Sequence, residues 1–186
     1  MLSIINMNDY LNVYSSPCLL MQKSASFFAV PQDIYDDSAK ERRFLMQRGF
    51  NLQLLYTLQD KAHLMLYSRT LLKKTLSIKD VKKALHFFGY SCINRLDSLL
   101  QLLFVRLYEF GKARETHKNT CFPHEMGLFL DYPPDDVMQY YIKKGKDYIF
   151  SGYWKVYAKP EWALKQFKKY DMCRLLCLKY GFCEFI

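Results

Sequence analysis

The sequence predicts a single α+β domain in which an antiparallel or mixed sheet of about four to five strands packs against amphipathic helices. The run FNLQLLYTL at 50–58 alternates apolar and polar residues, as a half-buried strand does. The segment 96–107 instead repeats leucines at helical spacing. A chain of 186 residues is long enough to bury one core without metal or disulfide support. We therefore expect one domain over 1–186, with an N-terminal half 1–110, a polar loop 111–120 and a C-terminal half 121–186.

Three regions are expected to supply the strands. SFFAV at 26–30 has the apolar run of a buried strand, and 50–58 with HLMLYS at 63–68 reads as a hairpin. In the first hairpin strand, alternation predicts one shared face for Phe50, Leu52, Leu54, Tyr56 and Leu58. In FSGYWKVY at 150–157, the same rule turns Trp154 and Val156 one way and Ser151, Tyr153, Lys155 and Tyr157 the other.

The helices are expected from their end signals. Ser38 with Glu41, and Ser77 with Asp80, have capping-box spacing, and Gly49 and Gly89 stand where those helices would end. Prolines at 133–134 and 160 open two further helices, about 134–144 and about 160–180. The leucine-rich helix after Asn94 is the expected spine of the fold, with a stripe formed by Leu96, Leu99, Leu100, Leu103, Phe104 and Leu107.

Composition favours an anionic partner and a cytoplasmic protein. The net charge of +9 attracts nucleic acid, phosphorylated metabolites or acidic protein faces, and 15 Tyr with 14 Phe exceed what a core of this size needs. The chain lacks the apolar stretch of about 18 residues that crosses a membrane, and its opening lacks the features of a secretory signal. Its six cysteines are irregularly spaced, so we expect reduced thiols.

Several enzyme classes lack their motifs here. The chain has no glycine-rich phosphate loop, no dinucleotide-binding fingerprint, no nucleophile elbow and no kinase signature. Leu128 and Phe129 follow His124-Glu125 where a zinc protease would need a second histidine.

The last third of the chain contains FPHEMGLFLDYP at 122–133, GYWKVY at 152–157 and a Y-x-x-C at 170–173. These motifs resemble the signature of a bacterial family known as domain of unknown function 3793. That signature reads F-P-H-E-[IM]-G-L-F-L-G-Y-P, an acidic helix, G-Y-W-K-V-Y, and a helix ending in Y-x-x-C. The matching residues are Phe122, Pro123, His124, Glu125, Gly127, Tyr132, Pro133, Gly152, Trp154, Lys155, Tyr157, Tyr170 and Cys173. The N-terminal half is similar more loosely, through Pro17, Leu19 and Lys23. Asp131 replaces a glycine of the family, and Asp tolerates a left-handed turn better than most residues. The resemblance implies a fold and a set of positions, because the family has no established activity.

His124 and Glu125 are the first candidates for chemistry, as an imidazole beside a carboxylate can transfer protons or bind metal. On a strand they would face opposite sides, and on a helix they would diverge, so a capping or packing role stays open. Whether HEMGLFLD forms a strand or a short helix is also open. Cys121 and His124 have a C-x-x-H spacing, and Cys173 with Cys177 lie at i, i+4, which suggests a weak candidate metal site. Buried core cysteines have the same spacing.

Tyr153, Lys155 and Tyr157 are the candidate binding surface. On one strand face they would stack on bases and hold phosphate, although a solvated face with an extended lysine fits the same pattern. Short connections around the helix at 134–144 predict that Lys155 approaches His124. The ammonium would then disfavour protonation of the imidazole.

The leading hypothesis is a cytoplasmic binding or regulatory protein that engages nucleic acid, or a nucleic-acid-bound protein complex, as a modulator or inhibitor. A second hypothesis is a small enzyme or a protein that binds a metal or cofactor, centred on His124, Glu125, Lys155 and Tyr157. A third is a protein interaction module that uses the apolar C-terminus LLCLKYGFCEFI. The cofactor, the substrate and the oligomeric state are left open.

Overall fold

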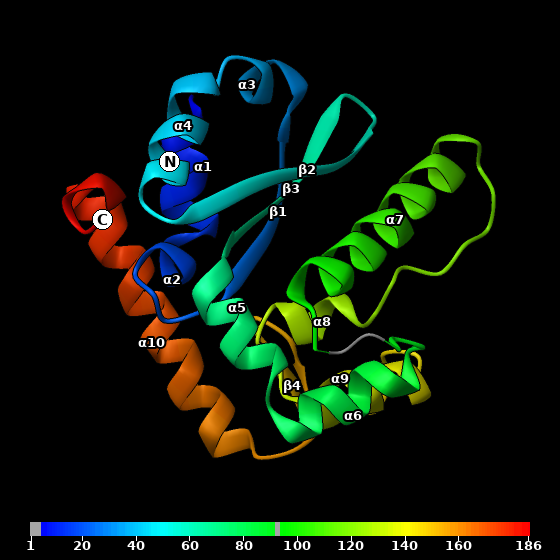
Figure 1. Ribbon diagram of the computed structural model, residues 1–186. Helices are drawn as coiled ribbons and strands as arrows, with labels where there is room; N and C mark the ends of the chain where they lie inside the picture. The colour runs from blue at the N-terminus through cyan, green and yellow to red at the C-terminus, as the bar shows by residue number, and fades with distance from the viewer. Residues whose placement is uncertain (1–4, 92–93) are drawn as a thin grey trace.

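The computed structural model describes residues 5–91 and 94–186 and confirms the α+β fold class (Figure 1). Strands β1 (Ala25–Pro31), β3 (Lys61–Ser68) and β2 (Phe50–Leu58) form an antiparallel sheet in that order. Strands β4 (Phe150–Ser151) and β5 (Lys155–Val156) pair only with each other. The strands of the described residues are thus divided between a three-stranded sheet and a separate short hairpin, where we expected one sheet.

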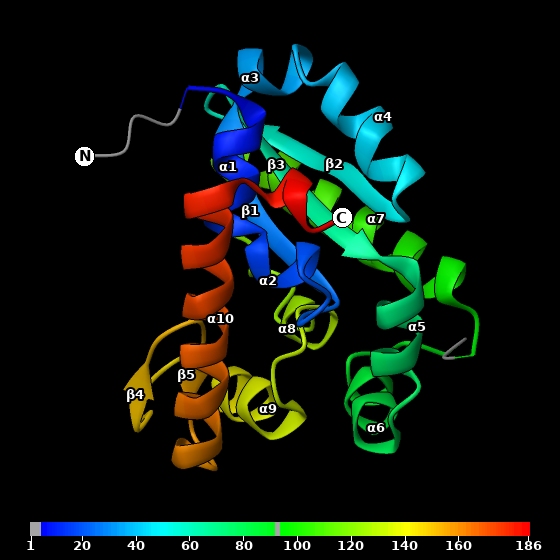
Figure 2. The same cartoon turned by 90° about the vertical axis from the view of Figure 1, so that its left-hand side faces the viewer.

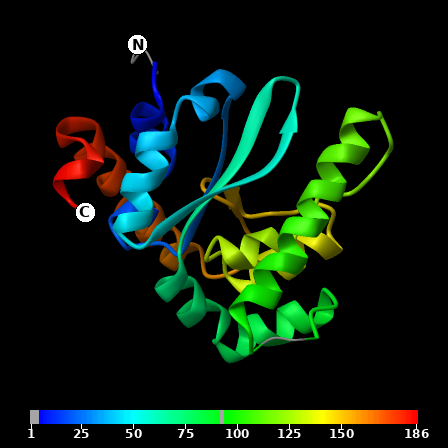
Figure 3. The ribbon, with the colours of Figure 1, turned by 45° about the horizontal axis from the view of Figure 1, so that its top comes forward.

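Both faces of the larger sheet are covered by helices (Figure 3). Along β3, Ala62, Leu64 and Leu66 face one apolar cluster, while Met65 and Tyr67 face the other. The first cluster includes residues of α1 (Met7–Tyr14), α2 (Ser16–Leu19), α4 (Ala39–Gln47), α10 (Pro160–Tyr180) and the 3-10 helix η1 (Phe182–Glu184). The second includes residues of α5 (Arg69–Leu76), α6 (Lys79–Phe87), α7 (Leu96–Glu115), α8 (Met126–Phe129) and α9 (Pro134–Ile142). Helix α3 (Gln32–Asp36) connects β1 to α4.

The expected alternation along β2 is broken by a bulge. The pairing with β3 shifts between Leu54 and Tyr56, so an additional residue enters the strand there. Phe50, Leu52 and Leu54 therefore pack with the first cluster, whereas Tyr56 and Leu58 pack with the second. The prediction of one shared face was wrong, because a bulge reverses the alternation beyond it.

The glycines predicted to end two helices do so, whereas the capping boxes predicted at the starts of these helices are absent. Gly49 and Gly89 have φ near +82°, which confirms that they end α4 and α6. The two capping boxes do not form. The hydroxyl of Ser38 donates to the carbonyl of Tyr35, and that of Ser77 donates to Lys74. These serines end the preceding turn and leave the first amides of the next helix without a side-chain cap.

Helix α7 is longer than the sequence indicated. Leu99, Leu100, Leu103 and Leu107 are buried, as the stripe predicts. The helix then continues to Glu115, through the first half of the expected polar loop 111–120. Gly111 permits this, because a Cβ atom at that position would stand 2.5 Å from the Tyr56 Cβ. The loop therefore begins at about Thr116.

The apolar C-terminus is part of the core. Helix α10 packs along α1 and α2, as Figure 2 shows. Cys177 and Phe182 are buried there, and the Phe182 amide donates to Asn12 Oδ1 at 2.9 Å. The segment named as a docking module thus covers the N-terminal helices. Within the described part of the chain, no helix has both the length and the apolarity needed to span a bilayer.

Candidate functional site

A cavity of about 380 Å³ lies between the β4–β5 hairpin, α9 and the segment that contains α8. We call it the aromatic cavity. Its ring-bearing lining residues are Phe27, Phe122, His124, Tyr132, Tyr140, Tyr153 and Trp154. Gly127, Ser151, Gly152 and Lys155 also line it. A cavity of this size that is mostly apolar, with a few polar groups, is typical of small-ligand sites in proteins.

Asp136 joins α9 to the hairpin at the base of the cavity. One carboxylate oxygen accepts a hydrogen bond from Trp154 Nε1 at 2.8 Å. The other accepts from the backbone amides of Tyr157 and Ala158, both at 2.9 Å. Asp136 is 2% exposed, so these three donors compensate for the burial of its charge. Its role is to hold the hairpin on the helix.

Trp154 forms the inner wall of the aromatic cavity. The sequence predicted that it would face the core. It is 6% exposed and meets Phe167 of α10 edge-on, with 4.5 Å between ring centroids. Gly152 makes this contact possible, since a Cβ there would lie 2.2 Å from the Phe167 ring.

His124 lies in the turn before α8, with its ring 5.0 Å from that of Tyr140. Burial lowers its pKa below the usual 6.5, against the opposing effect of the Glu125 carboxylate. The imidazole is therefore neutral at pH 7 and presents one N–H donor and one nitrogen acceptor. Within the described residues, neither ring nitrogen has a hydrogen-bond partner. His124 is thus free to bond a ligand in the cavity.

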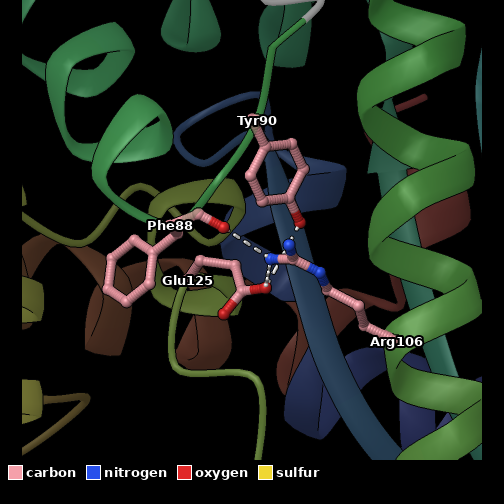
Figure 4. Close-up of polar contacts among 4 residues, drawn as sticks. All are labelled: Phe88, Tyr90, Arg106 and Glu125. Carbon is pink, nitrogen blue, oxygen red and sulfur yellow. Dashed lines mark hydrogen bonds and ion pairs between the residues drawn. The ribbon is translucent and has the colours of Figure 1, made fainter.

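Glu125 points away from the aromatic cavity, into a buried cluster with Arg106 and Tyr90 (Figure 4). Its carboxylate oxygen lies 2.6 Å from Arg106 Nη1 and 3.4 Å from the Tyr90 hydroxyl. Arg106 also donates to the Phe88 carbonyl at 2.9 Å. The residue pair His124-Glu125 is therefore split between two sites. Glu125 fixes the start of α8 to α6 and α7, and the HEMGLFLD segment contains a short helix, not a strand.

Lys155 lines the same cavity as His124, and both lie near the Tyr140 ring. Its Nζ donates to the Gly145 carbonyl at 2.8 Å and lies 4.6 Å and 5.7 Å from the ring centroids of Tyr148 and Tyr140. His124 and Lys155 therefore line one cavity. The expected cause of the neutral imidazole was wrong, because burial lowers the His124 pKa and Lys155 is not among its causes.

Tyr153, Lys155 and Tyr157 do not share one strand face, because residues 152–154 form the hairpin turn. The Tyr153 hydroxyl reaches α10 and donates to Asp171 at 3.0 Å, and burial is the main cause that raises its pKa to about 12. Tyr157 lies under Lys143, whose Nζ is 5.5 Å from the ring centroid. Each of the two tyrosines therefore has its own environment, apart from Lys155.

Lys23 lies behind the cavity wall and is 7% exposed. Its Nζ is 5.1 Å from the ring centroid of Tyr132, which lines the cavity, and 5.9 Å from that of Tyr170. Burial lowers its pKa to about 8, against the attraction of the Asp131 carboxylate. Asp131 has φ +58°, so it keeps the left-handed turn, and it accepts a hydrogen bond from the Ser24 amide. Lys23 thus supports the site from outside.

The cysteines considered as metal ligands are not gathered. Cys121 is exposed before α8, whereas Cys173 and Cys177 are buried on α10, where burial raises the pKa of both thiols. Metal binding needs the thiolate form, which such burial disfavours. The described residues contain no group of three or more His, Cys, Asp or Glu side chains that could hold a metal ion.

Tyr140 and Asp136 are site residues that the sequence reasoning missed. On α9, Tyr141 and Ile142 are 48% and 59% exposed. The inner face instead carries Asp136, Val137 and Tyr140. The i, i+4 spacing of Asp136 and Tyr140 was the available signal.

Lys155, through its hydrogen bond to the Gly145 carbonyl, lies next to a lysine run that follows α9. We call Lys155 together with the exposed Lys143, Lys144 and Lys146 the basic rim. Tyr148, 42% exposed, and Tyr141 stand among them. Tyr141 also meets Phe87, which is 55% exposed, edge-on at 5.7 Å. Exposed rings thus flank the lysine run, which also contains the exposed Asp147.

Comparison with known proteins gives one match. The model of the family described as "Protein of unknown function (DUF3793)" matches residues 11–181. Neither the curated proteins nor the solved structures contain a match. The match covers the aromatic cavity and the basic rim, so both lie within the region that characterises the family.

Proposed function

The chain belongs to the DUF3793 family, and we propose that it is a binding protein that holds single-stranded nucleic acid on the basic rim of the aromatic cavity. The observation that carries the proposal is the position of Lys155, whose ammonium lies beside the rings of Tyr148 and Tyr140 at the cavity mouth. An ammonium that contacts a phosphate there would set the attached base against a tyrosine ring.

The chemistry of the rim fits a single strand better than a duplex. Single-strand binding combines cationic grooves, which follow the phosphates, with aromatic rings on which bases stack. Tyr141 and Tyr148 offer such rings, and Lys143, Lys144 and Lys146 lie close to them in the chain. Paired bases in a duplex do not expose their faces to such rings. The net charge of +9 adds long-range attraction for the phosphates of the strand. The cytoplasmic location expected from the sequence stays a prediction.

A titration of labelled single- and double-stranded oligonucleotides at two salt concentrations tests the proposal. We expect tighter binding of the single strand, weakened by salt, because bound lysines release counterions from the phosphates. Lys155→Ala should weaken binding, whereas Lys40→Ala, which removes an exposed charge on α4, should not. Absence of binding, or equal loss in the two variants, would contradict the proposal.

A further inference from the structure

We propose that the aromatic cavity accepts one unstacked nucleobase of the bound strand, with the adjoining phosphate held by Lys155. This inference rests on the proposed function and adds a specific ligand for the interior of the cavity. A cavity of about 380 Å³ falls within the range of small-ligand sites, so it has room for a flat heterocycle.

The walls favour a flat aromatic ligand. The rings of Phe122, Tyr132, Tyr140 and Trp154 come from different segments and enclose the same space. The ring centroids of Tyr132 and Trp154 lie 5.2 Å apart, and the ring planes are inclined by 31°. Together these two rings form one aromatic wall of the cavity. Stacking on such rings stabilises any base, because every base has a π face.

Several polar groups of the cavity already have partners, which limits what a ligand can bond. Trp154 Nε1 is bonded to Asp136 and the Tyr153 hydroxyl to Asp171. His124 keeps both ring nitrogens available within the described residues. A neutral imidazole offers one donor and one acceptor, which complements the edge of a base, where donors and acceptors alternate.

The charge distribution places the phosphate outside. Lys155 lines the cavity and, beyond it, three exposed lysines of the rim follow α9. The carboxylate in the lining belongs to Asp136, and its oxygens already accept three hydrogen bonds. A base inside with its phosphate outside therefore matches both the apolar interior and the cationic mouth. A purely apolar peptide side chain would leave Lys155 and His124 unused.

The test uses the full chain with Trp162→Phe, so that Trp154 is the remaining tryptophan. Trp162 is 44% exposed, so this change should preserve the fold. Tryptophan fluorescence is recorded while a nucleoside monophosphate, the corresponding nucleoside or ribose 5-phosphate is added. We expect the nucleotide to quench Trp154 and to bind at least about tenfold more tightly than the sugar phosphate, because the sugar phosphate cannot stack.

Two variants separate the contributions of base and phosphate. His124→Ala should weaken nucleotide binding several-fold and leave the sugar phosphate unaffected, whereas Lys155→Met should weaken both. Circular dichroism checks that each variant is folded. Equal affinity for nucleotide and sugar phosphate, or binding of the nucleoside that is as tight as that of the nucleotide and independent of Lys155, would overturn the inference. If oligonucleotides bind in that case, the rim proposal survives; if none binds, the proposed function itself fails.

Discussion

Trp154 Nε1 donates a hydrogen bond to Asp136 Oδ2 at 2.8 Å, and both residues are buried beneath the aromatic cavity. The bond ties the β4–β5 hairpin to α9, two elements that otherwise share few contacts. Everything proposed for the site depends on this attachment, because it holds Lys155 of the hairpin near Tyr140 of the helix.

Asp136→Ala should destabilise the protein by about 3 kcal/mol or more, because three buried donors lose their acceptor. Asp136→Asn should cost less, since its amide oxygen can still accept from the two backbone amides. Urea denaturation of the two variants and the wild type measures both effects. Equal cost for Ala and Asn would mean that the backbone bonds contribute little.

Trp154→Ala should cost on the order of 3–5 kcal/mol, as expected for removal of a large buried ring. The space left lies against Phe167 and Tyr132, whose ring centroids are 4.5 Å and 5.2 Å away. Thermal melts monitored by circular dichroism check this. The exposed Trp162 provides the control, and Trp162→Ala should cost much less. A Trp154→Ala protein as stable as the wild type would show that the hairpin is not held by its tryptophan.

His124→Gln should remove the part of the pH dependence of the unfolding free energy that comes from the His124 imidazole. The folded pKa of His124 lies below the unfolded value of 6.5, so the unfolded chain binds more protons between these values. The stability associated with the neutral imidazole is therefore present above pH 6.5 and is lost as pH falls through that window. Urea midpoints at pH 7.5 and pH 5 should differ less in the variant than in the wild type. Identical differences would contradict a depressed pKa.

Lys23→Met should be compared with the wild type at alkaline pH. Burial lowers the Lys23 pKa from 10.5 to about 8, so the unfolded state binds more protons between these values. Stability from this group therefore rises with pH across the window of about 8 to 10.5. The wild type should gain on the order of 3 kcal/mol relative to the variant over that range. The comparison cancels the titration of groups that do not interact with Lys23, and no relative gain would mean that Lys23 is not buried in solution.

The sequence was sufficient for those parts of the fold that local pattern decides. Gly49 and Gly89 end helices because positive φ suits glycine, and the leucines of α7 are buried because they recur at helical spacing. Alternation failed where an irregularity intervened. The bulge after Leu54 reversed the alternation along β2, and the turn at 152–154 interrupted the strand expected at 150–157. Residue type alone gives no strong signal for either feature.

The site was predicted in part. The position of Lys155 and His124 in one cavity lining followed from the short connections around α9, and the burial of Trp154 followed from alternation. The partner of Glu125 was not predictable, since Arg106 lies 19 residues away on another helix. Tyr140 was missed because Tyr140 and Tyr141 are adjacent tyrosines, and residue type alone does not show which of them faces the cavity. Tertiary packing decides between two such adjacent residues.

The most direct test of the central claim is the salt dependence of single-strand binding by the wild type, Lys155→Ala and Lys40→Ala. If the four lysines of the rim each contact a phosphate, the logarithm of the binding constant should fall with the logarithm of salt concentration with a slope of about −3. Lys155→Ala should keep its fold, bind more weakly and show a slope smaller by about 0.7, while Lys40→Ala should match the wild type. Binding with no dependence on salt, or a Lys155→Ala protein that binds as the wild type does, would contradict the proposal.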